Sequence, residues 1–174
     1  ISRLVYVHGL MNKEGAEAEI RLGDSLMARV PANTEIVATY LNNLGVLRVS
    51  AGELGEARDA LERSLELKMQ IYGESHLEVA YALANLAEVE LLEGYYPRAQ
   101  DLIQRALPVF FDMFGPNQPQ TGALLANLAV ASAQSGLRTE ADESFRKMEK
   151  ALPVTSGAWE DLGPLILPGR GDVY

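Results

Sequence analysis

Three asparagines recur at a constant interval and carry side chains suited to recognising a peptide backbone. Asn43, Asn85 and Asn127 follow one another at steps of 42 residues. A carboxamide offers both a hydrogen-bond donor and an acceptor, so a row of them can pair with an extended peptide of any sequence. The same side chains could instead bond helix carbonyls or water and only hold neighbouring repeats in register. The sequence leaves both interpretations open.

Residues suited to catalysis or metal binding are sparse and scattered. The two histidines, His8 and His76, lie far apart, and we expect His76 to cap a helix or to lie in a loop. Glu88, Glu90 and Glu93 do not share a helix face at the spacing of a carboxylate pair. The chain has no cysteine, no His/Cys metal spacing and no glycine-rich phosphate loop. We therefore predict a protein without catalytic residues, metal or cofactor.

The charge of the chain narrows the class of partner. With 24 acidic and 15 basic residues the net charge is −9, which disfavours nucleic acid and anionic membrane surfaces. No apolar run approaches the ~18–20 residues that span a bilayer, so we expect no membrane insertion. The chain begins at Ile1, and we expect further residues before it in the full protein. The cytoplasm is favoured as its location, with the periplasm or the extracellular space as alternatives.

The asparagines belong to a longer repeat of the same period. The segment Leu41–Gly45 matches residues 83–87 and 125–129, and downstream landmarks keep the spacing. These landmarks are Gly52, Gly94 and Gly136, then Ala57, Ala99 and Ala141, then Leu61, Ile103 and Phe145. A fixed period of ~20–50 residues indicates a solenoid, whose units bury their apolar faces by stacking on one another.

Each repeat reads as two helices joined by a glycine turn. Leu41, Leu44 and Leu47 lie three residues apart on one helical face, and Gly52 then ends the helix. A second apolar stripe follows, beginning at Ala57. We therefore predict an all-α fold with four helix pairs. They span residues 2–29, 34–71, 76–113 and 118–151 of an array that covers residues 1–152.

The loops between pairs contain possible start signals for the next helix. Ser75 with Glu78 has the form of a capping box, and Asn117 with Gln120 is a variant of it. In such a box the serine and the glutamate side chains would each bond a backbone N–H at the helix start.

The periodic pattern stops after Leu152. Residues 153–174 are rich in proline and glycine, yet they include Trp159 and several leucines. This tail is either a linker or a cap that folds back on the flank of the last helix, around Phe145 and Met148.

The repeat resembles the tetratricopeptide repeat, whose pattern is a large residue, then Leu-Gly, then Ala-x-x-x-aromatic. Leu41-x-x-Leu44-Gly45 and Ala57-x-x-x-Leu61 fit it. The usual period is 34 residues, whereas a unit of 42 with Leu-Asn-Asn-Leu and Tyr-Gly-x-x-His resembles the kinesin-light-chain type. Similar arrays are widespread in bacteria, so we expect a bacterial array. The resemblance implies a right-handed α-solenoid of stacked antiparallel helix pairs.

The resemblance also implies where a ligand would bind. The first helix of each pair would line a concave groove, and its inward residues would contact an extended peptide. They are Asn42, Asn43, Val46, Tyr81, Asn85, Glu88, Leu92, Asn127, Val130 and Gln134. Relatives that clamp a C-terminal carboxylate carry Lys or Arg beside the asparagine, where this chain has Asn42, Ala84 and Ala126. The expected partner is a neutral to basic, partly apolar segment of another protein.

The sequence thus predicts a non-catalytic protein–protein interaction scaffold, as a monomer or a weak homo-oligomer. Two alternatives stay open. The array could be structural and associate with itself through apolar ends, or it could be the regulatory arm of a larger enzyme or signalling protein.

Overall fold

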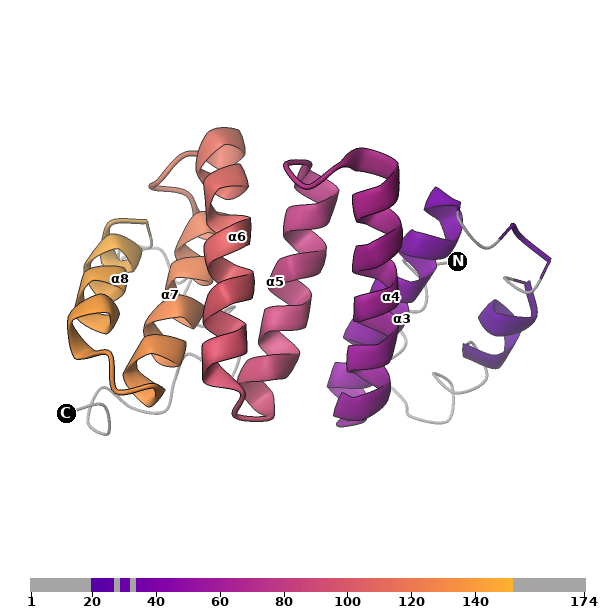
Figure 1. The fold of residues 1–174 in the computed structure, drawn as a ribbon, viewed down its shortest axis with the longest axis horizontal. Coiled ribbons are helices and arrows are strands. Elements are labelled where there is room, and N and C mark those ends of the chain that lie inside the picture. The colour runs from indigo at the N-terminus through magenta and orange to yellow at the C-terminus, as the bar shows by residue number, and fades with distance from the viewer. Residues whose placement is uncertain (1–19, 27–28, 32–33, 152–174) are drawn as a thin grey trace. The chain divides into compact units, whose positions relative to one another are not determined.

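The computed structural model describes residues 20–26, 29–31 and 34–151, and every regular element in that part of the chain is a helix. The labelled helices are α3 (Glu35–Ala51), α4 (Leu54–Tyr72), α5 (Leu77–Leu92), α6 (Tyr96–Phe114), α7 (Pro119–Gln134) and α8 (Arg138–Ala151) (Figure 1). Residues 20–26 are helical as well and belong to the predicted first helix pair, residues 2–29, most of which lies outside the described residues. The predicted all-α class is confirmed.

The chain divides into two units within α5. The first comprises Ile1–Val89 and the second Glu90–Tyr174. The first unit therefore holds α3, α4 and most of α5, while the second holds the last turn of α5 with α6, α7 and α8. We describe each unit by itself.

Glycines end the first helix of each pair because the chain must turn there through a left-handed conformation. Gly52, Gly94 and Gly136 have φ of 78°, 80° and 78°, a region that costs other residues a steric clash. The N–H of Gly52 bonds the carbonyls of Arg48 and Val49, which closes the end of α3. The landmarks that define the repeat are thus the residues that reverse the chain.

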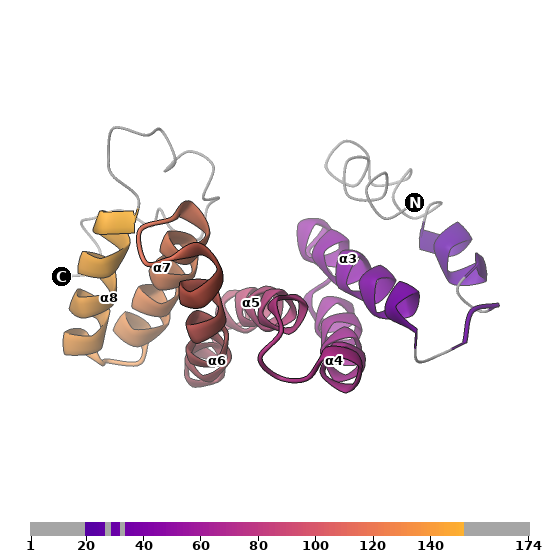
Figure 2. The ribbon, with the colours of Figure 1, turned by 90° about the horizontal axis from the view of Figure 1, so that it is seen from above.

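The core of the first unit lies between α3 and α4, which run side by side (Figure 2). Ala38 on α3 and Ala57 and Leu61 on α4 are 0% exposed. Gly45 allows the closest approach, because a Cβ built there would lie 2.4 Å from Leu61 Cγ. Small residues at these positions therefore set the short distance between the two helices.

The second unit repeats this arrangement with α6, α7 and α8. Ala99 and Ile103 of α6 and Ala129 of α7 are 0% exposed. Leu91 and Ala131 pack with Ala99 in one cluster. Alternating alanines and larger apolar residues again fill the space between the helices.

The start of α5 differs from the predicted capping box. The carbonyl of His76 accepts bonds from Val79 N and Ala80 N, both at 3.0 Å. Its ring Nδ1 accepts from Glu78 N at 3.2 Å. The cap is therefore His76 rather than Ser75. The imidazole stacks on Tyr72 with ring centroids 4.4 Å apart, which holds it over the helix end. The predicted capping role of His76 is confirmed.

The start of α7 also lacks the predicted capping box between Asn117 and Gln120. The residue before this helix is Gln118, and its side chain makes no capping bond. Thr121 instead donates from Oγ1 to the carbonyl of Gly115 at 2.8 Å, which ties the loop to the first turn.

The last described helix carries a charged outer face. Ala141, Ser144, Met148 and Ala151 form its buried stripe, and Phe145 is half-buried. Met148 is only 3% exposed. The exposed residues of α8 include Asp142, Glu143, Arg146, Lys147, Glu149 and Lys150. The predicted tail, residues 153–174 with Trp159, lies outside the described residues.

Candidate functional site

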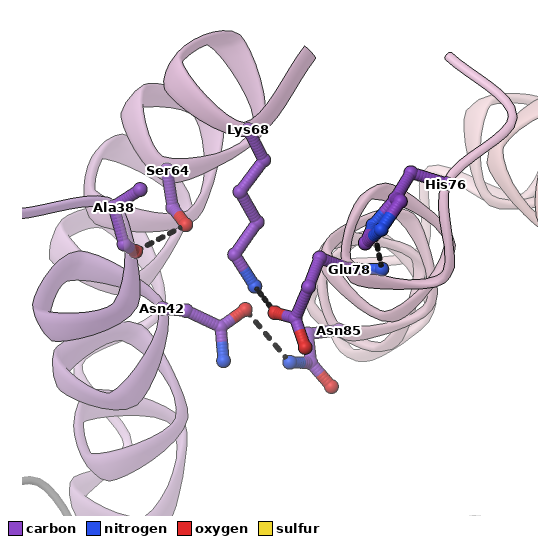
Figure 3. A network of polar contacts seen from close by, with 7 residues as sticks. All are labelled: Ala38, Asn42, Ser64, Lys68, His76, Glu78 and Asn85. Atoms are coloured by element: carbon purple, nitrogen blue, oxygen red, sulfur yellow. Dashed lines mark hydrogen bonds and ion pairs between the residues drawn. The ribbon is translucent and has the colours of Figure 1, made fainter. Parts of the chain in front are cut away.

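Two of the predicted asparagines meet in the first unit. Asn85 Nδ2 on α5 donates to Asn42 Oδ1 on α3 at 3.1 Å (Figure 3). Both side chains are half-buried. Asn85 thus bonds the neighbour of its repeat equivalent, Asn43, and not Asn43 itself. The bond joins the first helices of two consecutive pairs, as the register interpretation requires.

This bond leaves the pair with a defined polarity. Asn42 Oδ1 and Asn85 Nδ2 are engaged, while the Asn42 amide nitrogen and the Asn85 carbonyl oxygen make no described bond. Figure 3 shows both of these atoms turned to the side away from Lys68. The pair therefore offers one donor from α3 and one acceptor from α5 on the same side.

An ion pair between a buried lysine and a half-buried glutamate lies next to the asparagines. Lys68 of α4 is 3% exposed, and its Nζ lies 2.7 Å from Glu78 Oε2 on α5. Ser64, also on α4, donates to the carbonyl of Ala38 on α3 at 2.7 Å. We call the residues Asn42, Ser64, Lys68, Glu78 and Asn85 the polar joint. It connects the α3–α4 pair to the next helix through side chains (Figure 3).

Sequence reasoning did not identify the ion pair, although the repeat contained a signal for it. Lys68 stands at the position that Phe110 occupies one repeat later, and Phe110 is buried with 3% exposure. A lysine at a buried apolar position needs an anionic partner, because burying an unpaired charge is costly.

Asn43 behaves differently from Asn85. It is half-buried on α3, and no hydrogen bond joins its side chain to another residue of the described part of the chain. The three predicted asparagines are therefore not equivalent. Asn85 is engaged in the polar joint, whereas the carboxamide of Asn43 keeps its donor and its acceptor for another group.

Tyr81, Asn85 and Glu88 follow one another along one face of α5, at helical spacings of four and three residues. All three are half-buried. Burial raises the pKa of the Glu88 carboxyl, and no cation lies against it among the residues that the structure describes. Val46 on α3 is half-buried too.

The remaining predicted residues belong to the second unit. Asn127, Val130 and Gln134 share one face of α7, where Asn127 and Val130 are half-buried and Gln134 is exposed. Val130 also packs against the cluster of Leu91, Ala99 and Ala131, so part of its side chain serves the core. Leu92, at the end of α5, is 39% exposed.

Two further observations concern metal ions and membranes. Within residues 20–26, 29–31 and 34–151, no three His, Cys, Asp or Glu side chains are grouped to hold a metal ion. None of the described helices is long and apolar enough to cross a membrane.

Comparison with known proteins relates part of the chain to a known repeat. Residues 36–110 match the family model of the tetratricopeptide repeat, as the sequence pattern predicted. The chain is similar to the crystal structure of BtubC (BKLC) from P. vanneervenii, with 21% sequence identity and a TM-score of 0.72. The match covers 79% of this chain and 56% of that one. This likeness shows the fold, an α-solenoid of helix pairs. Comparison with curated proteins gave no match.

Proposed function

Because residues 36–110 match the tetratricopeptide repeat, we propose that the chain is a non-catalytic scaffold that binds a segment of another protein. In the first unit the segment lies extended along α3 and α5, the first helices of two consecutive pairs. The observation that supports this most is the Asn42–Asn85 pair, which keeps one donor and one acceptor on the same side. A peptide backbone alternates the same two groups and can pair with them.

The partner is neutral to basic and partly apolar. Val46, Tyr81, Leu92 and Val130 offer apolar surface, and the candidate residues include an acid but no lysine or arginine. A cation is what a C-terminal carboxylate would need, so the bound segment is internal to the partner and not its carboxyl end.

The test separates ligand binding from repeat register. Peptides that bind the wild-type chain are selected from a randomised 12-residue library, and their affinity is measured by fluorescence anisotropy. Asn43→Ala should weaken binding with little change in melting temperature, because its side chain has no described partner. Asn85→Ala should weaken binding and also lower the melting temperature, because the hydrogen bond that it removes contributes about 0.5–1.5 kcal/mol.

The matched control is Gln104→Ala, which removes an exposed carboxamide from α6 and should alter neither quantity. The proposal fails if the folded triple variant Asn43→Ala, Asn85→Ala, Asn127→Ala retains the wild-type affinity. It also fails if the wild-type chain selects no peptide at all.

Self-association of the array is the competing function. The charged outer face of α8 argues against it at that end of the described chain, because interfaces between copies are depleted in charge at their centre. Sedimentation over a concentration series decides between the two, since only self-association predicts a mass that rises with concentration. The other alternative, a regulatory arm of a larger enzyme or signalling protein, is tested by the sequence of the full gene, which would have to encode the enzyme or signalling domain as well.

A further inference from the structure

We propose that Glu88 is the anchor for one lysine or arginine side chain of the bound segment, received between the Glu88 carboxylate and the carbonyl oxygen of Asn85. This inference rests on the proposed function and adds to it a chemical requirement at one position of the ligand.

The place of Glu88 in the repeat sets it apart. The equivalent residues one repeat before and after are Val46 and Val130. Glu88 is also the one charged residue among the ten predicted to face the ligand. A carboxylate thus stands where the neighbouring repeats have valine, and the other predicted ligand-facing residues are neutral.

Three other acids of the described residues that are shielded from water have cationic partners. Glu53 lies 2.6 Å from Arg48, Glu78 lies 2.7 Å from Lys68, and the buried Glu90 lies 3.3 Å from Arg98. Glu88 is half-buried like Glu53 and Glu78, yet it has no such partner in the described part of the chain. Its burial costs solvation that no internal contact offsets, and a cation from outside would offset it.

Asn85 determines what kind of group fits beside Glu88. The two residues are three apart on α5, so their side chains are neighbours on the helix surface. Asn85 Nδ2 already donates one of its two hydrogens to Asn42, whereas Asn85 Oδ1 makes no described bond and can accept one. Two adjacent acceptors, one of them anionic, suit an ammonium or a guanidinium group, which carries several donors and no acceptor.

Asn42 supplies the complementary polar group across the pair. Its free amide nitrogen lies on the same side as the Asn85 oxygen (Figure 3), and it can donate to a backbone carbonyl of the ligand. Residues of α5 would then bind the basic side chain of the ligand, while Asn42 of α3 would bind one of its backbone carbonyls. This fixes the direction in which the segment lies.

The experiment is a selection from a randomised 12-residue peptide library displayed on phage, carried out with four proteins. These are the wild-type chain, Glu88→Gln, Glu88→Lys and the control Glu66→Gln, which removes an exposed acid from α4. Wild type and Glu66→Gln should enrich peptides with Lys or Arg at one register position. Glu88→Gln should lose that preference, and Glu88→Lys should replace it by Asp or Glu.

One selected peptide then serves as a defined probe. Replacing its enriched lysine by norleucine should weaken binding to the wild-type chain about tenfold or more, and binding to Glu88→Gln by less than about twofold. Circular dichroism before each measurement confirms that both proteins are folded to the same extent. The ¹³C shift of the Glu88 carboxyl adds a direct readout, because the bound lysine should lower its pKa.

The outcomes separate this inference from the proposed function. If peptides are enriched but their motif is the same with Glu88→Lys, the scaffold stands and the anchor role of Glu88 is wrong. If motifs without any basic position are enriched by the wild-type chain, the anchor is again wrong. If the wild-type chain enriches nothing over the Asn43→Ala, Asn85→Ala, Asn127→Ala variant, both fail.

Discussion

The two units use equivalent positions for different chemistry where one helix pair meets the next helix. In the first unit the buried Lys68 of α4 forms an ion pair with the half-buried Glu78 of α5. In the second unit the equivalent residues are Phe110 and Gln120. Phe110 is as buried as Lys68, its ring packs against Phe114 at 5.6 Å between centroids, and Gln120 is exposed. The repeat thus fixes which positions are buried and leaves their chemistry open.

A second pair of equivalent positions shows the same divergence. Ser64 bonds the carbonyl of Ala38 in the first unit, and its counterpart in the second unit is Ala106, which is 0% exposed and purely apolar. The second unit has a polar contact elsewhere, where Gln100 of α6 donates to Ser132 of α7 at 2.9 Å.

The comparison teaches what each junction contributes. An apolar junction stabilises through the area that it removes from water. A buried ion pair contributes little net free energy, because the cost of removing two charges from water nearly equals their attraction. It is sensitive to alignment, however, and Lys68, Glu78 and the asparagines together favour one register of α5 against α3 and α4.

The largest expected effect tests the apolar junction. Phe110→Ala removes a buried ring and should lower the free energy of unfolding by about 3–5 kcal/mol. Urea denaturation followed by circular dichroism measures this. Met113→Ala on the same helix removes an exposed side chain and should cost far less. An equal loss in the two variants would contradict the assignment of Phe110 to the core.

The next effect concerns the ion pair, where two substitutions should differ. Glu78→Ala leaves the ammonium of Lys68 buried without its partner and should cost about 1–3 kcal/mol. Lys68→Met replaces the charge by an apolar chain of similar length and should change stability by less than about 1 kcal/mol. The same denaturation curves give both values. If Lys68→Met destabilises as much as Glu78→Ala, the ion pair is itself a major source of stability.

A smaller effect is expected at Gly45, which is alanine in the later repeats. An alanine there would meet Leu61 of α4 at 2.4 Å, and the forced shift should cost about 1–2 kcal/mol. The double variant Gly45→Ala, Leu61→Val makes room for the new methyl group and should recover part of the loss. Thermal unfolding checks this, and a stabilised single variant would show that α3 and α4 can separate without cost.

The smallest effect is a pH dependence at Glu88. Burial raises its pKa above the ordinary 4.5, so the ionised carboxyl opposes folding at neutral pH. Glu88→Gln should therefore melt at a higher temperature than wild type at pH 7. The difference should shrink as the pH falls through the raised pKa, because protonation then relieves the wild-type chain, and it should level off below about 4.5. A difference that grows toward low pH would mean that Glu88 is stabilised as an anion.

The sequence predicted the features of the repeat that depend on the conformation of short segments, namely the glycine turns and the buried stripes of the helices. Gly52, Gly94 and Gly136 recur because each turn needs a positive φ. The leucines and alanines of the repeat form buried stripes because a helix returns to the same face every three or four residues. The capping box failed for a local reason of another kind. The side chain of His76 caps the start of the helix, and the carboxylate of Glu78 pairs with Lys68 instead of a backbone N–H at the helix start.

The candidate site could be predicted less completely. The row Asn43, Asn85 and Asn127 identified the helices that carry the carboxamides, but not their partners. That Asn85 bonds Asn42, and leaves Asn43 without a described partner, depends on how far α5 is displaced along α3. Such an offset is not encoded in the period of 42, because the period fixes residue spacing along the chain and not the register between helices.

The sequence by itself determined the all-α class, the paired helices from residue 35 to 151, the glycine turns and the absence of cysteine chemistry. These follow from backbone conformation and from the spacing of apolar residues, which are properties of short segments. Only the tertiary structure decided that Lys68 is buried beside Glu78, that two asparagines interlock, and that Glu88 is half-buried without a described cation. These depend on which side chains the packed helices bring within bonding distance, and the physical cause is desolvation. Whether a charged or carboxamide side chain is paired inside the protein depends on which groups replace water around it after folding.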